Sequence, residues 1–291
     1  MARQLTGKRA YLKGLACVAA LVVVPLDSAA ADLDPRTASA YDRYIEAAEQ
    51  TFVKLISTDA FLTGGSAQAL GRLRQGEILL EPGGGDGIIS VPQGLIHHWR
   101  ATAFVPDTTL EQVLSLVRDY VKYPSVYDWV IASDLVSSEE DRSRLRAFFR
   151  ARRRTSGVTG VFDVWMVTEY RRVRPERATS IAASECVREV EHAGERGERR
   201  LQAGTGSGYL WRANSLSKYL ERDGGVYIEL DTIGLSRGFP AFLSWIIEPI
   251  ARRLGRSSTT DSLRQLRDAL TSPHDAVPAS TVVSSRSWCG V

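Results

Sequence analysis

The residues best suited to acid–base chemistry are sparse on the strand faces that the sequence directs inward. They are His97, Ser215, Ser217 and Thr232, and none has an obvious partner carboxylate nearby in the sequence. General acid–base catalysis needs a group whose pKa is tuned by burial or by a partner. His98 follows His97 in one strand and points to the opposite face, so the two histidines cannot ligate one metal ion without a bulge. No catalytic pair is evident on the inward faces.

The established catalytic and cofactor motifs are also missing. The chain has no G-x-S-x-G elbow, no H-E-x-x-H pair and no C-x-x-C pair. A glycine cluster spans residues 83–87, but it lacks the Lys-Ser/Thr of a phosphate-binding loop and the spacing of a dinucleotide-binding turn. The cluster predicts a flexible loop, and the sequence predicts neither a cofactor nor a metal.

The N-terminus is typical of an export signal. Four basic residues precede an apolar run at 14–26, and small residues follow up to Ala31. A membrane anchor is the alternative, but the run is shorter than the ~20 residues that span a bilayer. We therefore expect cleavage near Ala31 and a periplasmic or secreted protein. Residues 1–31 carry four basic side chains and Asp27, so their loss takes the formal charge from +3 to zero. A neutral chain does not predict nucleic-acid binding.

The composition of the whole chain, 44% hydrophobic and 24% charged, is ordinary for a globular protein. Apolar residues at helical spacing predict an amphipathic helix over 35–57, which we expect to pack on the main domain. Two cysteines remain after cleavage, Cys186 and Cys289. An exported protein allows a disulfide between them, but their separation and the small, polar tail at 272–291, predicted to be disordered, favour unpaired cysteines.

The clearest local prediction is a β-hairpin over residues 208–237, with its turn at 223–225. Asp-Gly and Gly-Gly supply the positive φ angles of a tight turn, and both flanks alternate with a period of two. After the turn, Ile228 and Leu230 share an apolar face, while Glu229 and Asp231 share a polar face that we expect to contact solvent.

Seven arginines lie between residues 142 and 154, in a predicted strand over 144–155. By strand alternation, Arg144, Arg146, Arg150 and Arg152 share one face, opposite an apolar face. Two interpretations remain open. Acidic residues on a neighbouring strand could balance a solvated face, or these four arginines could contact an anionic membrane.

The order of the other elements completes the prediction. A strand at 95–105 precedes a helix whose capping box is Thr108 with Glu111. The helix ends near Tyr123-Pro124, and about six antiparallel strands follow. An apolar C-terminal helix begins after residue 238, with a kink predicted at Pro249 and a further helical segment over 258–270.

This element order, together with the segment Val117-Arg-Asp-Tyr-Val-Lys-Tyr-Pro124, resembles the START-like or SRPBCC superfamily over residues 94–270. The segment is most similar to the polyketide cyclase/dehydrase and coenzyme-Q-binding branch. The resemblance implies an α+β helix-grip fold, in which a curved antiparallel sheet wraps a long C-terminal helix and leaves a cavity. The domain division is then a signal peptide at 1–31, a helical and glycine-rich flank at 32–93, a ligand-binding domain at 94–271 and a tail at 272–291.

The resemblance further implies that the interior binds a hydrophobic small molecule or lipid, which an exported protein could carry. The inward-facing residues expected to contact it are Trp99, Tyr123, Trp129, Phe149, Tyr209, Trp211, Tyr219, Ile228, Leu230, Phe242, Trp245 and Ile246. Each is also suited to a plain core. Two alternatives stay open, namely a cyclase, dehydratase or hydrolase on the same scaffold and an interaction module with a filled core.

Overall fold

The computed structural model describes residues 31–155, 158–239 and 241–272, and only the backbone at 155, 158, 241–248 and 250. Residues 1–30 of the predicted signal peptide and residues 273–291 of the predicted disordered tail, with Cys289, lie outside the described residues. So do the side chains of Phe242, Trp245 and Ile246.

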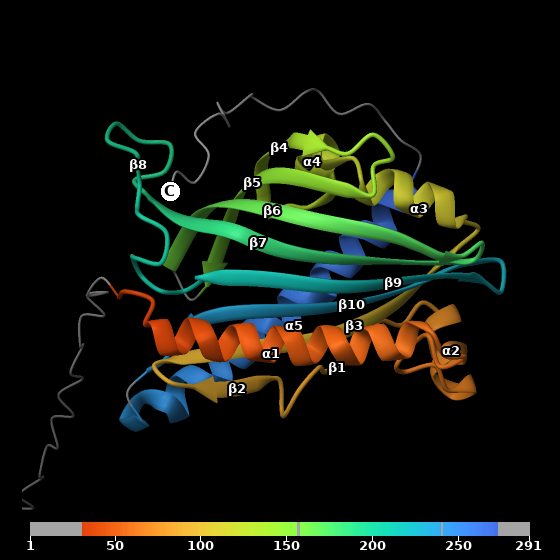
Figure 1. Cartoon of the computed structure of the whole chain (residues 1–291), viewed down its shortest axis with the longest axis horizontal. Coiled ribbons are helices and arrows are strands. Elements are labelled where there is room, and N and C mark those ends of the chain that lie inside the picture. Colours follow the sequence, from red (N-terminus) through yellow and green to blue (C-terminus); the bar gives the residue numbers. More distant parts are fainter. Residues whose placement is uncertain (1–30, 156–157, 240, 273–291) are drawn as a thin grey trace, which may run out of the picture.

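One antiparallel sheet of ten strands forms the body of the molecule (Figure 1). Eight strands follow the order β1-β3-β10-β9-β7-β6-β5-β4, while β2 pairs with β3 and β8 pairs with β7. The strands are β1 (Leu79–Pro82), β2 (Ile88–Val91), β3 (Gly94–Pro106), β4 (Val130–Ser138), β5 (Arg144–Thr155), β6 (Val158–Arg174), β7 (Arg177–Glu191), β8 (Arg199–Arg200), β9 (Arg212–Arg222) and β10 (Gly225–Arg237). The hairpin predicted around Asp223 and Gly224 is the β9–β10 pair, and both turn residues have positive φ.

The C-terminal helix α5 (Ala241–Thr271) crosses one face of the sheet, which we call the inner face (Figure 1). It is a single helix of 31 residues that contains Pro249. Its buried residues Leu263 and Leu266 join a core made by the inner faces of the strands and by α3 (Leu110–Val117). The predicted α+β helix-grip fold is therefore confirmed.

Two short helices close one end of this inner core. After α3 the chain forms η1 (Tyr120–Lys122) and α4 (Tyr123–Val126), at the predicted Tyr-Pro break. The capping box is one residue later than predicted, because Thr109 pairs with Gln112.

The opposite face, which we call the outer face, is covered by α1 (Pro35–Ile56), which lies along the sheet in Figure 1, and α2 (Ala67–Arg74). Tyr41 and Phe52 of α1 pack with Ile96, Leu216 and Tyr227 of the strands in a second core. The prediction of a solvated outer face on the hairpin is therefore wrong. Alternation separated the two faces, but the cover comes from a helix 170 residues earlier in the chain.

The segment before residue 94 is continuous with the sheet. Its strands β1 and β2 both pair with β3, and α1 starts from a cap in which Asp34 accepts a hydrogen bond from the backbone N–H of Arg36. Cys186 is buried beside Phe148 and Trp165, and it is disulfide-bonded. The expectation that Cys186 is unpaired is therefore not met.

The arginines of β5 face acidic residues of neighbouring strands. Arg144 pairs with Glu169, and Arg146 pairs with Glu185 at 2.7 Å. Arg150 forms a bidentate pair with Asp163, which is fully buried. These contacts match the interpretation of a balanced strand face.

Candidate functional site

The centre of the inner face is lined by small side chains. Ser180 of β7 lies opposite Ser217 of β9, and the next inward pair along these strands is Ala182 with Ser215. Leu230 of β10 follows in the same row as Ser217. Ser215 and Leu230 are only half-buried, although α5 crosses this face.

Tyrosines occupy the end of the inner face beside η1 and α4. The hydroxyl groups of Tyr120 and Tyr170 lie 3.1 Å apart, and those of Tyr170 and Tyr123 each donate to the carbonyl of Val117 at 2.7 Å. Burial raises the pKa of Tyr123 and Tyr170 well above the usual value. These phenols therefore stay neutral and act as hydrogen-bonding groups within an apolar wall.

The residues predicted to line the interior separate into three groups. Tyr123, Trp129, Phe149, Tyr219, Ile228 and Leu230 belong to the inner core, and Trp99 lies beside Gly255 of α5. Trp211 is instead buried in the outer core, because it precedes β9 and does not follow the alternation of that strand. Tyr209 is 40% exposed.

The polar candidates of the inner face are also paired with neighbours. The His97 ring contacts the hydroxyl of Ser236 at 2.8 Å, and Thr232 contacts Thr259 of α5 at 2.6 Å. Burial lowers the pKa of His97 to about 4, so its ring is neutral at physiological pH. None of the ion pairs found among the described residues involves the four inner-face candidates His97, Ser215, Ser217 and Thr232.

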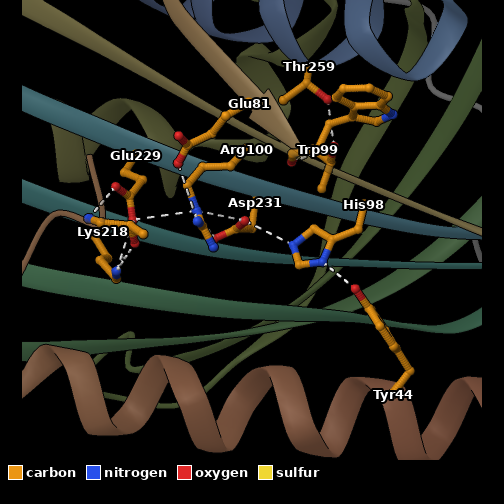
Figure 2. A network of polar contacts seen from close by, with 11 residues as sticks. Tyr44, Glu81, His98, Trp99, Arg100, Lys218, Glu229, Asp231 and Thr259 are labelled. Atoms are coloured by element: carbon orange, nitrogen blue, oxygen red, sulfur yellow. Dashed lines mark hydrogen bonds and ion pairs between the residues drawn. The ribbon is translucent and has the colours of Figure 1, made fainter. Parts of the chain in front are cut away.

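A chain of ionisable side chains lies on the outer face, beneath α1 (Figure 2). The hydroxyl of Tyr44 is 2.8 Å from Nδ1 of His98, and Nε2 of His98 is 2.9 Å from Asp231. Asp231 also accepts from Nε of Arg100. Because Asp231 is an acceptor, Nε2 of His98 carries the proton and Nδ1 accepts from Tyr44.

A second pair continues this chain along the strands. Nζ of Lys218 lies 2.8 Å from Glu229, and both side chains are at most 2% exposed. Glu229 also accepts from the backbone N–H and the hydroxyl of Thr63. Burial lowers the pKa of Arg100, but Asp231 and the other carboxylates raise it more, so the guanidinium remains charged.

Two glycines of the 83–87 cluster press against this network. A Cβ atom on Gly83 would lie 2.1 Å from the His98 ring, and one on Gly84 would lie 2.2 Å from the Tyr44 hydroxyl. Glycine is therefore required at both positions for the loop to cover Tyr44 and His98. The cluster has a packing role, which the sequence did not indicate.

A pocket of about 230 Å³ opens between α1 and this polar network. Its polar wall is formed by Tyr44, His98, Arg100, Lys218 and Asp231. Its apolar wall comes largely from Ala47, Ala48, Phe52 and Leu55 of α1 and Leu216 of β9.

Sequence reasoning assigned these polar residues to a solvated face and so missed the network. One signal was available: counting outward from the Asp223-Gly224 turn places Lys218 directly opposite Glu229. The pairing of Asp231 with Arg100 depends on the non-local β3–β10 register, which local alternation does not give. Buried ionisable groups that line a pocket are typical of functional sites, although structural networks share this property.

Neither a protein-family model nor a curated protein matches this chain. Several solved structures do match it. A STAR-related lipid transfer protein from Xanthomonas axonopodis is 13% identical, with a TM-score of 0.45 over 67% of this chain and 99% of its own. Human STARD10 is 10% identical, with a TM-score of 0.40 over 73% and 84%.

The Zhui aromatase/cyclase from Streptomyces sp. R1128 is 9% identical, with a TM-score of 0.37 over 60% of this chain and 96% of its own. These proteins are of the START type that the sequence resembles. At such identities and TM-scores the likeness says nothing about ligand or activity.

Two features are absent from the described residues. No helix there is both long and apolar enough to cross a bilayer. No group of three or more His, Cys, Asp or Glu side chains in the same part of the chain is arranged to hold a metal ion.

Proposed function

We propose that the chain binds a hydrophobic small molecule or lipid between the inner face and α5. The observation that supports this proposal is the row of small side chains at the centre of the face. Ser215 and Leu230 stay half-buried there, although α5 crosses the face. An apolar ligand placed against this row would be removed from water, at about 25 cal/mol for each Å² of apolar surface buried.

The tyrosines give the proposed site a polar end. The hydroxyl of Tyr219 lies 3.2 Å from that of Ser180, within the inner face. A ligand with one hydroxyl or carbonyl group could pair with these hydroxyls while its apolar part lies along the small side chains. With the predicted export signal, this arrangement supports a carrier that ferries its ligand outside the cytoplasm.

Native mass spectrometry of the protein purified from its own envelope tests the proposal. We expect a bound mass that organic extraction releases and identifies. Ser215→Phe should abolish this mass by filling the central row, whereas Ser137→Phe, on the exposed end of β4, should retain it. A wild-type protein that carries nothing and takes up nothing from a panel of lipids and quinones would contradict the proposal.

A second candidate function, a hydrolase-type enzyme, rests on the chain Tyr44–His98–Asp231 beside the outer pocket. A hydroxyl, an imidazole and a carboxylate in hydrogen-bonded series are the arrangement of an activated nucleophile. In such a reaction Tyr44 would attack a small ester while His98 takes its proton and passes it to the departing alcohol, which leaves an acyl group on the Tyr44 oxygen. Water, giving a proton to His98, would then release the acid and restore the Tyr44 hydroxyl. Burial and Asp231 raise the pKa of Tyr44, so this transfer to His98 is required.

Turnover of p-nitrophenyl acetate tests this second candidate. An active site at Tyr44 predicts an acetyl mass on that residue and loss of turnover in Tyr44→Phe. Tyr209, which is exposed, is the matched control for nonspecific acetylation. Equal labelling of Tyr44 and Tyr209 would leave the network with a structural role only.

A further inference from the structure

One flank of α5, next to β1, carries a group of arginines. Arg252, Arg253, Arg256 and Arg264 are exposed or half-buried, and they lie beside the part of the helix that buries Thr259 and Leu263. Together with Pro249, Ser257, Thr260, Asp261 and Leu80 of β1, they line an open groove of about 520 Å³. The groove contains four guanidinium groups and one carboxylate, a formal charge of 4 − 1 = +3.

Two of these arginines have no acidic partner among the described residues. Arg252 pairs with Asp86 at 2.6 Å, and Arg264 pairs with Asp261. Arg253 has no such contact, and Arg256 stacks over the ring of Trp99, 5.3 Å from its centroid. The pair of Arg264 with Asp261 is solvent-exposed, so it offers weak competition for an external anion.

Three of the four β5 arginines suggested for membrane contact behave differently. Arg144, Arg146 and Arg150 face Glu169, Glu185 and Asp163 respectively, so their charges are compensated within the sheet. Arg152 is exposed and forms no ion pair with the described residues. It stands apart from the arginines of α5, which share one groove.

We infer that this flank of α5, from Arg252 to Arg264, docks on a membrane surface that contains anionic phospholipid. The row covers twelve residue steps, or about 18 Å along the helix, which is long enough to contact several headgroups at once. Guanidinium groups pair well with phosphate oxygens, and the hydroxyls of Ser257 and Thr260 lie between the arginines as further donors.

A bilayer fits this surface better than a nucleic acid. The groove is open and follows one side of one helix, so a flat array of phosphates can reach all its arginines. The chain without residues 1–31 has a formal charge of about zero, which gives no long-range attraction to a polyanion. Docking through α5 would also bring the proposed ligand site, which α5 covers, next to the membrane, although the surface does not depend on that proposal.

Flotation with vesicles of phosphatidylcholine, with or without phosphatidylglycerol, tests the inference on the purified protein. We expect binding only to the anionic vesicles, weakening as salt is raised. Each arginine near such a surface changes binding about fivefold. The double variant Arg253→Gln/Arg256→Gln should therefore bind about thirtyfold more weakly. Arg253→Gln alone, which leaves the Trp99 contact intact, should bind about fivefold more weakly.

The matched control is Arg144→Gln/Arg146→Gln, which removes the same charge from β5. It should bind anionic vesicles as the wild type does, within about twofold. The loss of about fivefold applies only to an arginine that contacts the membrane, and the β5 arginines are not expected to do so. Equal losses in the two double variants would show attraction by net charge and overturn the assignment to α5. Absence of wild-type binding to anionic vesicles at low salt would overturn the docking surface altogether.

Discussion

The two faces of the sheet are built from alternate residues of the same strands, and both contribute to an apolar core, but the outer face also carries a network of buried charges. On β10, Ile228 and Leu230 point to the inner face, while Glu229 and Asp231 point to the outer face. Both faces are covered by a helix, and Glu229 and Asp231 are at most 3% exposed. The difference teaches that a strand face with polar residues need not be exposed to solvent.

The comparison also separates what each helix contributes. Helix α5 brings leucines and one threonine to a face of small and apolar side chains. Helix α1 brings Tyr44 to a face of charges that are already paired with one another. Buried ion pairs are often no more stabilising than apolar residues of the same size. Their presence beneath α1 is therefore weak evidence that they stabilise the fold more than apolar residues would.

The largest effect is expected from breaking the buried pair of the outer face. Glu229→Ala leaves the buried ammonium of Lys218 without its carboxylate, which should lower the free energy of unfolding by about 3–5 kcal/mol. Urea unfolding measures the change. The double variant Lys218→Met/Glu229→Leu removes both charges and should recover most of the loss. A double variant as unstable as Glu229→Ala would contradict the ion-pair explanation.

A smaller effect is expected where the glycine loop covers the network. Gly83→Ala forces a Cβ atom against the His98 ring and should lower the free energy of unfolding by about 1–3 kcal/mol, as overpacked sites do. Gly71→Ala is the control, because a Cβ there meets no atom within 4 Å and lies in α2. It should be stabilising by about 0.5–1 kcal/mol. Similar thermal shifts in both variants would rule out the close packing of Gly83.

The adjacent histidines allow the two faces to be compared by pH. His97 has a folded pKa of about 4 against an ordinary 6.5 because burial disfavours its charged form. Between these values the unfolded chain binds more protons, so stability is full above pH 6.5 and falls as the pH drops towards 4. Since the ring is half-buried, we expect His97 to account for about 1–2 kcal/mol of this loss, at ~1.4 kcal/mol per pKa unit.

His97→Gln should flatten the pH dependence of the free energy of unfolding between pH 6.5 and 4. His192→Gln changes an exposed histidine and should leave the slope as in the wild type. If His97→Gln keeps the wild-type slope, the loss of stability in this window comes from other groups.

The sequence predicted the parts of this fold that depend on local periodicity. The Asp223-Gly224 turn fixes the β9–β10 register, and the alternation after it separated Ile228 and Leu230 from Glu229 and Asp231 correctly. What covers each face depends on contacts between distant segments. Asp231 meets Arg100 from 131 residues earlier, and Thr63 reaches Glu229 across 166 residues. Neither contact produces a periodic pattern in the sequence, so the residues of the polar network were predicted to be exposed to solvent.

Trp211 shows a second limit of the same reasoning. Alternation placed it with Tyr219 on the inner face, but the ladder begins only at Arg212, and Trp211 packs in the outer core. Strand periodicity holds only where the strand is paired. A prediction from alternation is therefore weakest at the ends of a strand, where Tyr209 and Trp211 lie.

The smallest effects are expected from the single polar contacts that join each helix to its face. Thr259→Val removes the hydroxyl that pairs with Thr232, and Tyr44→Phe removes the hydroxyl that pairs with His98. Each should lower the free energy of unfolding by about 1 kcal/mol, the usual net value of one hydrogen bond. For Tyr44→Phe the loss stays small because the adjacent pocket lets water reach Nδ1 of His98.

Thr259 and Tyr44 lie on opposite faces of the sheet without a shared partner, so the double variant should show the sum of the two losses within about 0.5 kcal/mol. Urea unfolding of all three variants measures this sum, and a clear deviation from it would mean that the two helices are energetically coupled through the sheet.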